Sequence, residues 1–376
     1  MTAENDMALD GTLMACSRQW MMRPDDERFE SLPEMHEMMT AVRQRSKALG
    51  VSSKGLHATA IGDDHSGLVI QGPNGNPAAP TNFAFGQIAQ RAGAPAAYIR
   101  KLPSALAADC INYGLQTRDV EDLGVLLTDN GRGVPEMRAC TGPNYGRIWN
   151  SDIVQSLMAR FGDGRTGDWR VPGEFGREVR IGKHNTTLYA SDRDMFVFLC
   201  DEKNRVEVPN RRNGETGEMA RGFFVWNSEV GDKTLGVAMF LFDFVCANRI
   251  VWGVEGYKEV RVRHTSGAPD RWLGEVEPVL LEYQQSSVMP LEATLKAAQR
   301  AKIDDLNKFM ASRQFTARQA AKFQAAHEAE EGRPIETVWD ATTAITAVAR
   351  EMSHNDERVD LERRGGAVLD LVAEPV

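Results

Sequence analysis

Positively charged side chains recur along several stretches of this chain that have the composition of β-strands. In segment 258–263, strict alternation places Arg261 and Arg263 on one face of a strand and two valines on the other, which predicts one solvent-exposed and one buried face. Cations in such a row can contact phosphates, and aromatic side chains among them can stack bases at roughly 1–3 kcal/mol per base. The pattern therefore predicts binding of single-stranded DNA.

The candidate contacts come from several strand-like stretches and the loops between them. An alternative interpretation, a charged solvent-exposed face over an aromatic core, needs no ligand and stays open. The candidate cations are Arg177, Arg180, Lys183, Arg205, Arg211, Arg212, Lys258, Arg261 and Arg263, and the candidate stacking residues are Trp226, Trp252 and Tyr257.

A second candidate is the polar turn Asn227-Ser228-Glu229-Val230-Gly231, with Cys246 and Asn248 downstream. Asn, Ser and Gly are ordinary turn residues, and local hydrogen bonds account for them. Glu229 has no histidine or second carboxylate close in sequence that would make it a general acid or base. We therefore interpret this turn as structural. A metal-dependent nuclease built on Glu229, Asp232 or Asp243 stays as a further alternative.

Other motifs identify no reaction. The stretch 162–167 matches GxGxxG, but a helix is predicted before it and strands after it, the reverse of a dinucleotide site. The seven histidines never pair at metal-ligand spacing. We expect no catalytic residue, no cofactor and no metal ion.

Composition limits the class of protein. The 376 residues suffice for two domains or one elaborated domain, and a hydrophobic content of 42% is ordinary for a globular core. A net charge of −9 argues against a global positive field over duplex DNA, although a local basic groove is compatible with it. The five cysteines stand singly, and no apolar run approaches the length of a membrane span. We expect a cytoplasmic protein without a membrane partner.

Hydrophobic periodicity predicts an α+β fold: a central antiparallel β-meander, an N-terminal helical insert and a C-terminal helical region. The expected divisions are an arm over 1–30, a core domain over 31–270 and helices over 271–376. Within them we expect one helix over 32–49 and another capped by Asn150 or Ser151. Segment 275–301 reads as one long helix that Pro278 and Pro290 offset or break.

The turn at 227–231 also carries a resemblance. Together with the segment 244–248, it resembles the core of the phage/plasmid-like proteins grouped as domain of unknown function 932, in which an "NSEVG" segment precedes an apolar strand and a "CTNG" turn. The resemblance implies a protein of phages and plasmids found beside recombination and antirestriction genes. It implies no catalytic residues, because none are established in that family.

The leading hypothesis is a mobile-element protein that binds single-stranded DNA as a homo-oligomer, with strand annealing in recombination as an extension. The alternative is a non-enzymatic antirestriction or anti-defence factor that binds a host protein through the acidic helices after Glu275.

Overall fold

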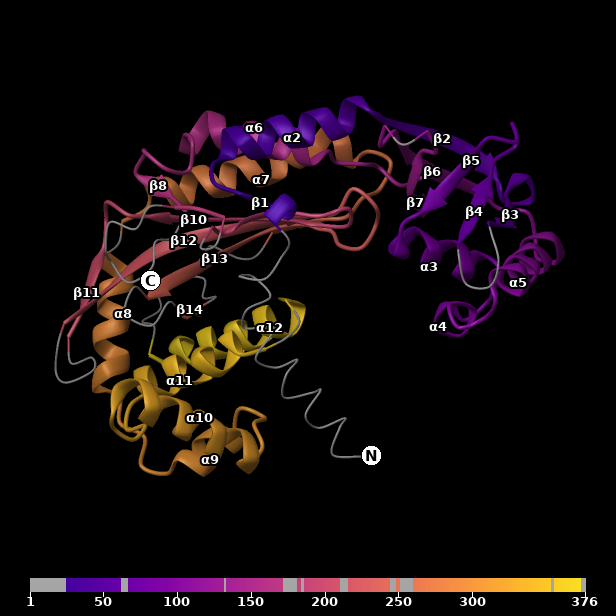
Figure 1. The fold of residues 1–376 in the computed structure, drawn as a ribbon. Coiled ribbons are helices and arrows are strands. Elements are labelled where there is room, and N and C mark those ends of the chain that lie inside the picture. Colours follow the sequence, from indigo (N-terminus) through magenta and orange to yellow (C-terminus); the bar gives the residue numbers. More distant parts are fainter. Residues whose placement is uncertain are drawn as a thin grey trace.

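The computed structural model describes residues 25–61, 67–131, 133–171, 181–183, 186–209, 216–243, 248–250, 260–287, 289–352 and 355–372. The α+β fold is confirmed: in these residues two sheets are combined with helices (Figure 1). No described helix combines the length and the apolar character that crossing a membrane requires.

The larger sheet, sheet A, is antiparallel throughout its described pairs, as predicted for the central meander. Its main path runs β1-β9-β10-β12-β13-β14, while β8, β11 and β15 pair at its margins. The strands are β1 (Arg28–Phe29), β8 (Trp169–Arg170), β9 (Leu188–Ala190), β10 (Met195–Asp201), β11 (Val206–Val208), β12 (Gly217–Asn227), β13 (Leu235–Asp243), β14 (Asn248–Ile250) and β15 (Val260–Val262).

Both faces of the central strands are buried. One face packs against α2 (Leu32–Gln44), α6 (Asn150–Phe161) and α7 (Ala268–Gln285), which lie over the sheet in Figure 1. The opposite face carries an aromatic cluster that includes Phe198, Phe224 and Phe240. Every residue of β10 is buried, because its apolar run does not alternate with polar residues. The solvent-exposed face expected from segment 258–263 therefore does not extend over the middle of the sheet.

A second sheet, sheet B, carries the predicted helical insert. Its strand order is β2-β6-β7-β5-β4-β3, with one parallel pair, β5 with β7. The insert packs on this sheet around a separate core that includes Ile88, Ile111 and Val125. The elements are β2 (Ser46–Ser52), β3 (His57–Ala60), β4 (Leu68–Gln71), β5 (Pro77–Pro80), α3 (Asn82–Arg91), α4 (Ala96–Ile99), α5 (Ser104–Thr117), β6 (Asp122–Thr128) and β7 (Glu136–Thr141).

The C-terminal helices form a third core around α11, whose residues from Val338 to Ala349 are all buried. The helices are α8 (Met289–Arg300), α9 (Leu306–Ala311), α10 (Ala317–Glu331), α11 (Val338–Arg350) and α12 (Asn355–Gly366). Short 3₁₀ turns lie at η1 (Asp25–Glu27), η2 (Ser53–Gly55) and η4 (Leu369–Leu371).

Three boundaries differ from the expectations. The helix predicted over 32–49 ends at Gln44, because residues 46–52 form β2 and pair with β6. The helical segment predicted over 275–301 begins earlier, at Ala268; it is broken between Gln285 and Met289, one of the outcomes expected from its prolines, although Pro278 lies within α7. The segment 28–29, placed in the expected arm, pairs with β9 and belongs to sheet A.

The start of α11 predicts a pH dependence of stability. Arg333 donates two hydrogen bonds to the carboxylate of Asp340, at 2.8 and 2.6 Å. Burial works to raise the pKa of Asp340, but the hydrogen bonds and charge of Arg333 outweigh it, so this pKa lies below its ordinary value. A carboxyl whose pKa is lower when folded contributes stability above its unfolded pKa of about 3.9, and this contribution is lost as the pH falls through the folded value.

We therefore expect the free energy of unfolding to fall below about pH 4 more steeply in the wild-type protein than in Asp340→Asn. Urea midpoints measured at pH 3 and pH 6 provide the comparison. The difference in urea midpoint between the wild-type protein and Asp340→Asn should be smaller at pH 3 than at pH 6. A gap of equal size at both pH values would contradict the assignment.

Candidate binding site at the junction of the two sheets

Part of the predicted DNA-contacting set lies outside the described residues, together with one residue of the turn motif. These are Arg177, Arg180, Arg211, Arg212, Lys258, Trp252, Tyr257 and Cys246. Asn248 is described through its backbone, which pairs with Asp243 in sheet A.

Two predicted cations lie beside carboxylates. Arg205 forms ion pairs with Glu202 and Glu218, the latter at 2.6 Å, and Lys183 lies 3.9 Å from Glu34. Arg205 precedes β11, which pairs with the start of β12, whereas β15 pairs with β13 beside the end of β12. At about 3.3 Å per residue these two ends are roughly 20–25 Å apart. The described cations therefore do not form one track.

Arg261 and Arg263 do project together. Both are exposed while Val262 between them is buried, which confirms the predicted alternation in β15. The Arg261 guanidinium lies 5.9 Å from the ring centroid of Trp226. It can reach that ring because Gly236 separates the two residues in the strand register, and a Cβ there would come within 2.0 Å of the indole.

Trp226 is only 7% exposed, because its ring lies under Arg261 and under Arg363 of α12. A cation–π contact of this kind uses the ring face on which a base would stack. As the structure stands, Trp226 supports Arg261 rather than offering a stacking surface.

Two further cations at this end of sheet A were not predicted from the sequence. Arg193 lies in the loop between β9 and β10, 3.6 Å from Asp232, and Lys233 lies in the loop between β12 and β13. Arg193 stands in a turn with the composition of an ordinary solvated hairpin, so its ion pair with Asp232 has no local sequence signal.

The turn at 227–231 is buried from Asn227 to Val230, although its composition is typical of an exposed turn. One carboxylate oxygen of Glu229 accepts a hydrogen bond from Arg138 at 3.0 Å, and the other accepts one from the backbone N–H of Asn150 at 2.9 Å. The side chains of both charged residues are almost fully buried. The predicted cap of α6 is therefore wrong: Trp149 is the N-cap without a side-chain bond, and the distant Glu229 carboxylate satisfies the helix N-terminus.

Asn227 and Ser228 complete this junction. Asn227 donates to the carbonyl of Ile148 and to the side chain of Asn150, while Ser228 donates to the carbonyl of Arg193. Gly231 adopts a φ of 93°, in the left-handed region that favours glycine. These contacts are those of a structural connection.

Sheet B is attached through the same turn. Gln87 of α3 donates to the carbonyl of Val230 and accepts from the backbone of Cys140 in β7, both at 2.8 Å. Arg138 of β7 also donates to the carbonyl of Asp192. The turn therefore joins sheet A, α6 and sheet B.

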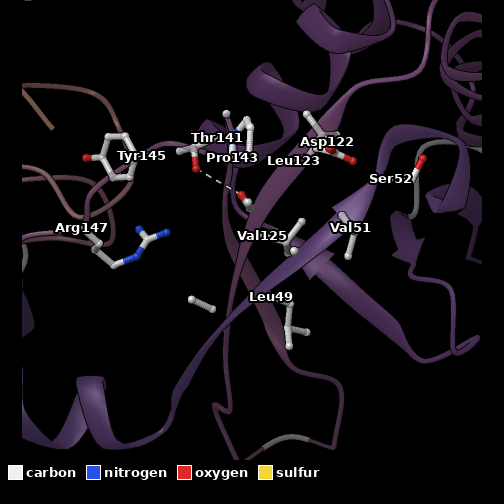
Figure 2. A pocket seen from close by; sticks show the side chains of 14 residues that line it. Leu49, Val51, Ser52, Asp122, Leu123, Val125, Thr141, Pro143, Tyr145 and Arg147 are labelled. Carbon is white, nitrogen blue, oxygen red and sulfur yellow. Dashed lines mark hydrogen bonds between the residues drawn. The ribbon is translucent and has the colours of Figure 1, made fainter. Parts of the chain in front are cut away.

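A cavity of about 420 Å³ lies beside this junction, and Arg147 points toward it from the segment between β7 and α6 (Figure 2). The Arg147 Nε and Nη1 atoms are buried, and no described residue forms a hydrogen bond with either of them. Burial lowers the pKa of Arg147, yet a guanidinium stays charged in a protein. Burial likewise raises the pKa of Tyr145 and lowers that of His264, whose rings stack at 4.8 Å.

The carboxylates considered for a nuclease have other partners. Both oxygens of Glu229 accept the bonds described above, and Asp232 lies within 4 Å of Arg193 and Lys233. The side chain of Asp243 is outside the described set. Across the described segments, no group of three His, Cys, Asp or Glu side chains is arranged to hold a metal ion.

No protein-family model, no curated protein and no solved structure matches this chain. The resemblance to the phage/plasmid-like family thus stays a prediction from the motif.

Proposed function

We propose that this protein binds single-stranded DNA without acting on it chemically, and that it serves a phage or plasmid. The observation that supports the proposal is the exposed pair of Arg261, in β15, and Arg263, which follows it. The loops that carry Arg193 and Lys233 lie at the same end of sheet A. Exposed cations at adjacent same-face positions lie about 6–7 Å apart along a strand, close to the spacing of successive phosphates in an extended strand.

The proposed contact surface is smaller than the one predicted from the sequence. Arg205 and Lys183 already have carboxylate neighbours, so a phosphate would have to compete with Glu218 or Glu34 for them. Arg261 and Arg263 are both exposed, so a phosphate can approach them from solvent. Because this surface is short, stable binding along a strand favours several protein copies side by side, which accords with a homo-oligomer.

The affinity for a labelled oligonucleotide, measured by fluorescence anisotropy, should fall with salt. Two phosphate contacts, from Arg261 and Arg263, predict a loss of about 7-fold between 50 and 200 mM salt. Removing two contacts should weaken binding about 25-fold at 0.1 M salt, and the double variant Arg261→Glu/Arg263→Glu, which also adds repulsion, should weaken it further.

The matched control is Arg300→Glu/Arg318→Glu, which makes the same charge change at exposed positions of α8 and α10. It should retain most of the wild-type affinity, because these residues lie in the C-terminal helices. Equal losses in both double variants would show a nonspecific effect of net charge and would contradict the proposed surface.

A further inference from the structure

The cavity at the junction has the volume of a small-molecule site. Its volume is about 420 Å³, within the range of roughly 300–1,000 Å³ typical of ligand pockets. Its walls come from β2, β6 and the segment that follows β7, so both the edge of sheet B and the junction with sheet A line it (Figure 2).

Arg147 brings a positive charge to this cavity. Its Nε and Nη1 donors have no hydrogen-bond partner among the described residues, and its guanidinium lies 5.4 Å from the ring centroid of Tyr145 and 5.8 Å from that of Trp149. The nearby carboxylate of Glu229 is already bonded to Arg138 and to a backbone N–H. Buried donors without acceptors are rare and costly in native proteins, so their retention here indicates an acceptor that binds from outside.

The segment that carries Arg147 is held in place from both sides. Tyr145 donates its hydroxyl to the carbonyl of Ser228 at 2.7 Å. Gly146 and His264 exchange two hydrogen bonds, each 3.0 Å long. A Cβ at Gly146 would lie 1.9 Å from the carbonyl oxygen of Thr265, so only glycine allows this approach. The guanidinium is thus positioned before any ligand arrives, which reduces the entropic cost of binding.

The rest of the cavity is amphipathic. Leu49, Val51 and Val125 form an apolar wall, while Ser52 and Asp122 lie at the end away from Arg147 (Figure 2). A complementary ligand has an anionic group at one end, a body with apolar surface, and hydrogen-bond donors at the other end that a carboxylate can accept.

We infer that this cavity binds a phosphate monoester of the nucleoside monophosphate class, with the phosphate on Arg147 and the base toward Asp122. A phosphate monoester fits better than a carboxylate because it carries more charge and three acceptor oxygens for the free donors. The inference goes beyond DNA binding by β15, since it uses none of those cations. The phosphate monoester can belong to a free nucleotide or to the phosphorylated end of a strand.

Thermal unfolding with a deoxynucleoside monophosphate, the same nucleoside without phosphate, and acetate at equal ionic strength tests the inference. At a ligand concentration ten times Kd, the ratio of folded to unfolded wild-type protein should rise about 11-fold with the monophosphate. The nucleoside and acetate should produce no comparable rise. Arg147→Met should abolish the response and, without ligand, should be at least as stable as the wild type, because it removes an unpaired buried charge.

The matched control is Arg100→Met, in a second cavity of about 420 Å³ on sheet B. Arg100 already donates to the carbonyl of Asn82 at 2.7 Å and lies 5.0 Å from the centroid of Phe85. This variant should respond to the monophosphate as the wild type does. A response that survives Arg147→Met, or one produced equally by the bare nucleoside, would overturn the inference. A wild-type protein that is not stabilised by the monophosphate would also overturn the inference. If Arg147→Met were then less stable than the wild type, Arg147 would be a purely structural stacking residue.

Oligonucleotides with a 5′-phosphate and a 5′-hydroxyl separate the two sources of the phosphate. Tighter binding of the phosphorylated strand, lost in Arg147→Met, assigns the cavity to strand ends. Equal binding of both strands, with the monophosphate response retained, assigns it to the free nucleotide. If oligonucleotide binding depends on Arg261 and Arg263 but not on Arg147, the proposed DNA-binding surface at β15 is supported, whatever the monophosphate experiments show for the cavity.

Discussion

Glu229→Gln is expected to destabilise the protein by about 3–5 kcal/mol, because it leaves the charge of Arg138 buried without its partner. The side chains of the two residues are only 3% and 6% exposed, and the Nη1–Oε2 distance is 3.0 Å. Glutamine keeps the shape of glutamate, and its carbonyl oxygen can still accept from the backbone of Asn150. The substitution therefore isolates the charge. Urea unfolding at pH 7 measures the effect.

Two control variants test whether this loss of stability comes from the unpaired buried charge. The double variant Glu229→Gln/Arg138→Met should be more stable than Glu229→Gln alone, because no unpaired charge stays buried. Glu336→Gln removes the charge from an exposed pair with Lys302, whose N–O distance of 3.1 Å is similar, and should change stability by less than about 1 kcal/mol. A loss in Glu229→Gln as small as that in Glu336→Gln would refute the assignment of the turn as a buried ionic junction.

Arg221→Met is expected to cost a similar amount, about 3–5 kcal/mol, for a related reason. Arg221 donates from Nε and Nη2 to Asp201 at 3.0 and 2.9 Å, and Asp201 is 1% exposed. It also donates to the carbonyls of Tyr283, Gln284 and Ser286, at the end of α7. The guanidinium therefore neutralises a buried carboxylate and satisfies the helix C-terminus together.

Hydrogen exchange distinguishes this double role from simple loss of a charge pair. In Arg221→Met the last turn of α7 should exchange faster than its first turns, because the carbonyls that Arg221 bonds lose their donor. Adding Asp201→Asn should recover part of the global stability but should leave the last turn unprotected. Recovery of both properties together would mean that Arg221 acts only on Asp201.

The sequence was informative where local pattern decides structure. Antiparallel strands joined by short polar turns predicted sheet A, and the alternation in segment 258–263 correctly predicted the exposure of Arg261 and Arg263. Sheet B was harder to predict. Residues 46–52 continue the helical spacing of α2, and β5 has the sequence Pro-Ala-Ala-Pro, which has the composition of a loop. Pairing with partners distant in sequence determines both strands, and local preference is weaker than such pairing.

The candidate sites likewise combine features that local sequence predicts with features that depend on contacts distant in sequence. The turn at 227–231 was correctly identified as a distinct element, but its burial depends on Arg138, Asn150 and Gln87, which are 91, 79 and 143 residues from their partners in the turn. Arg147 lies in a stretch without any motif. Only the fold reveals that its donors lack acceptors.

The same separations have a consequence for the order of folding. Contacts that close loops this long carry a large entropic cost until both sheets exist, so the junction at 227–231 should form after the rate-limiting step. Weakening it would then accelerate unfolding while leaving the folding rate nearly unchanged. The turn would form late in folding and would determine how long the native state persists before it unfolds.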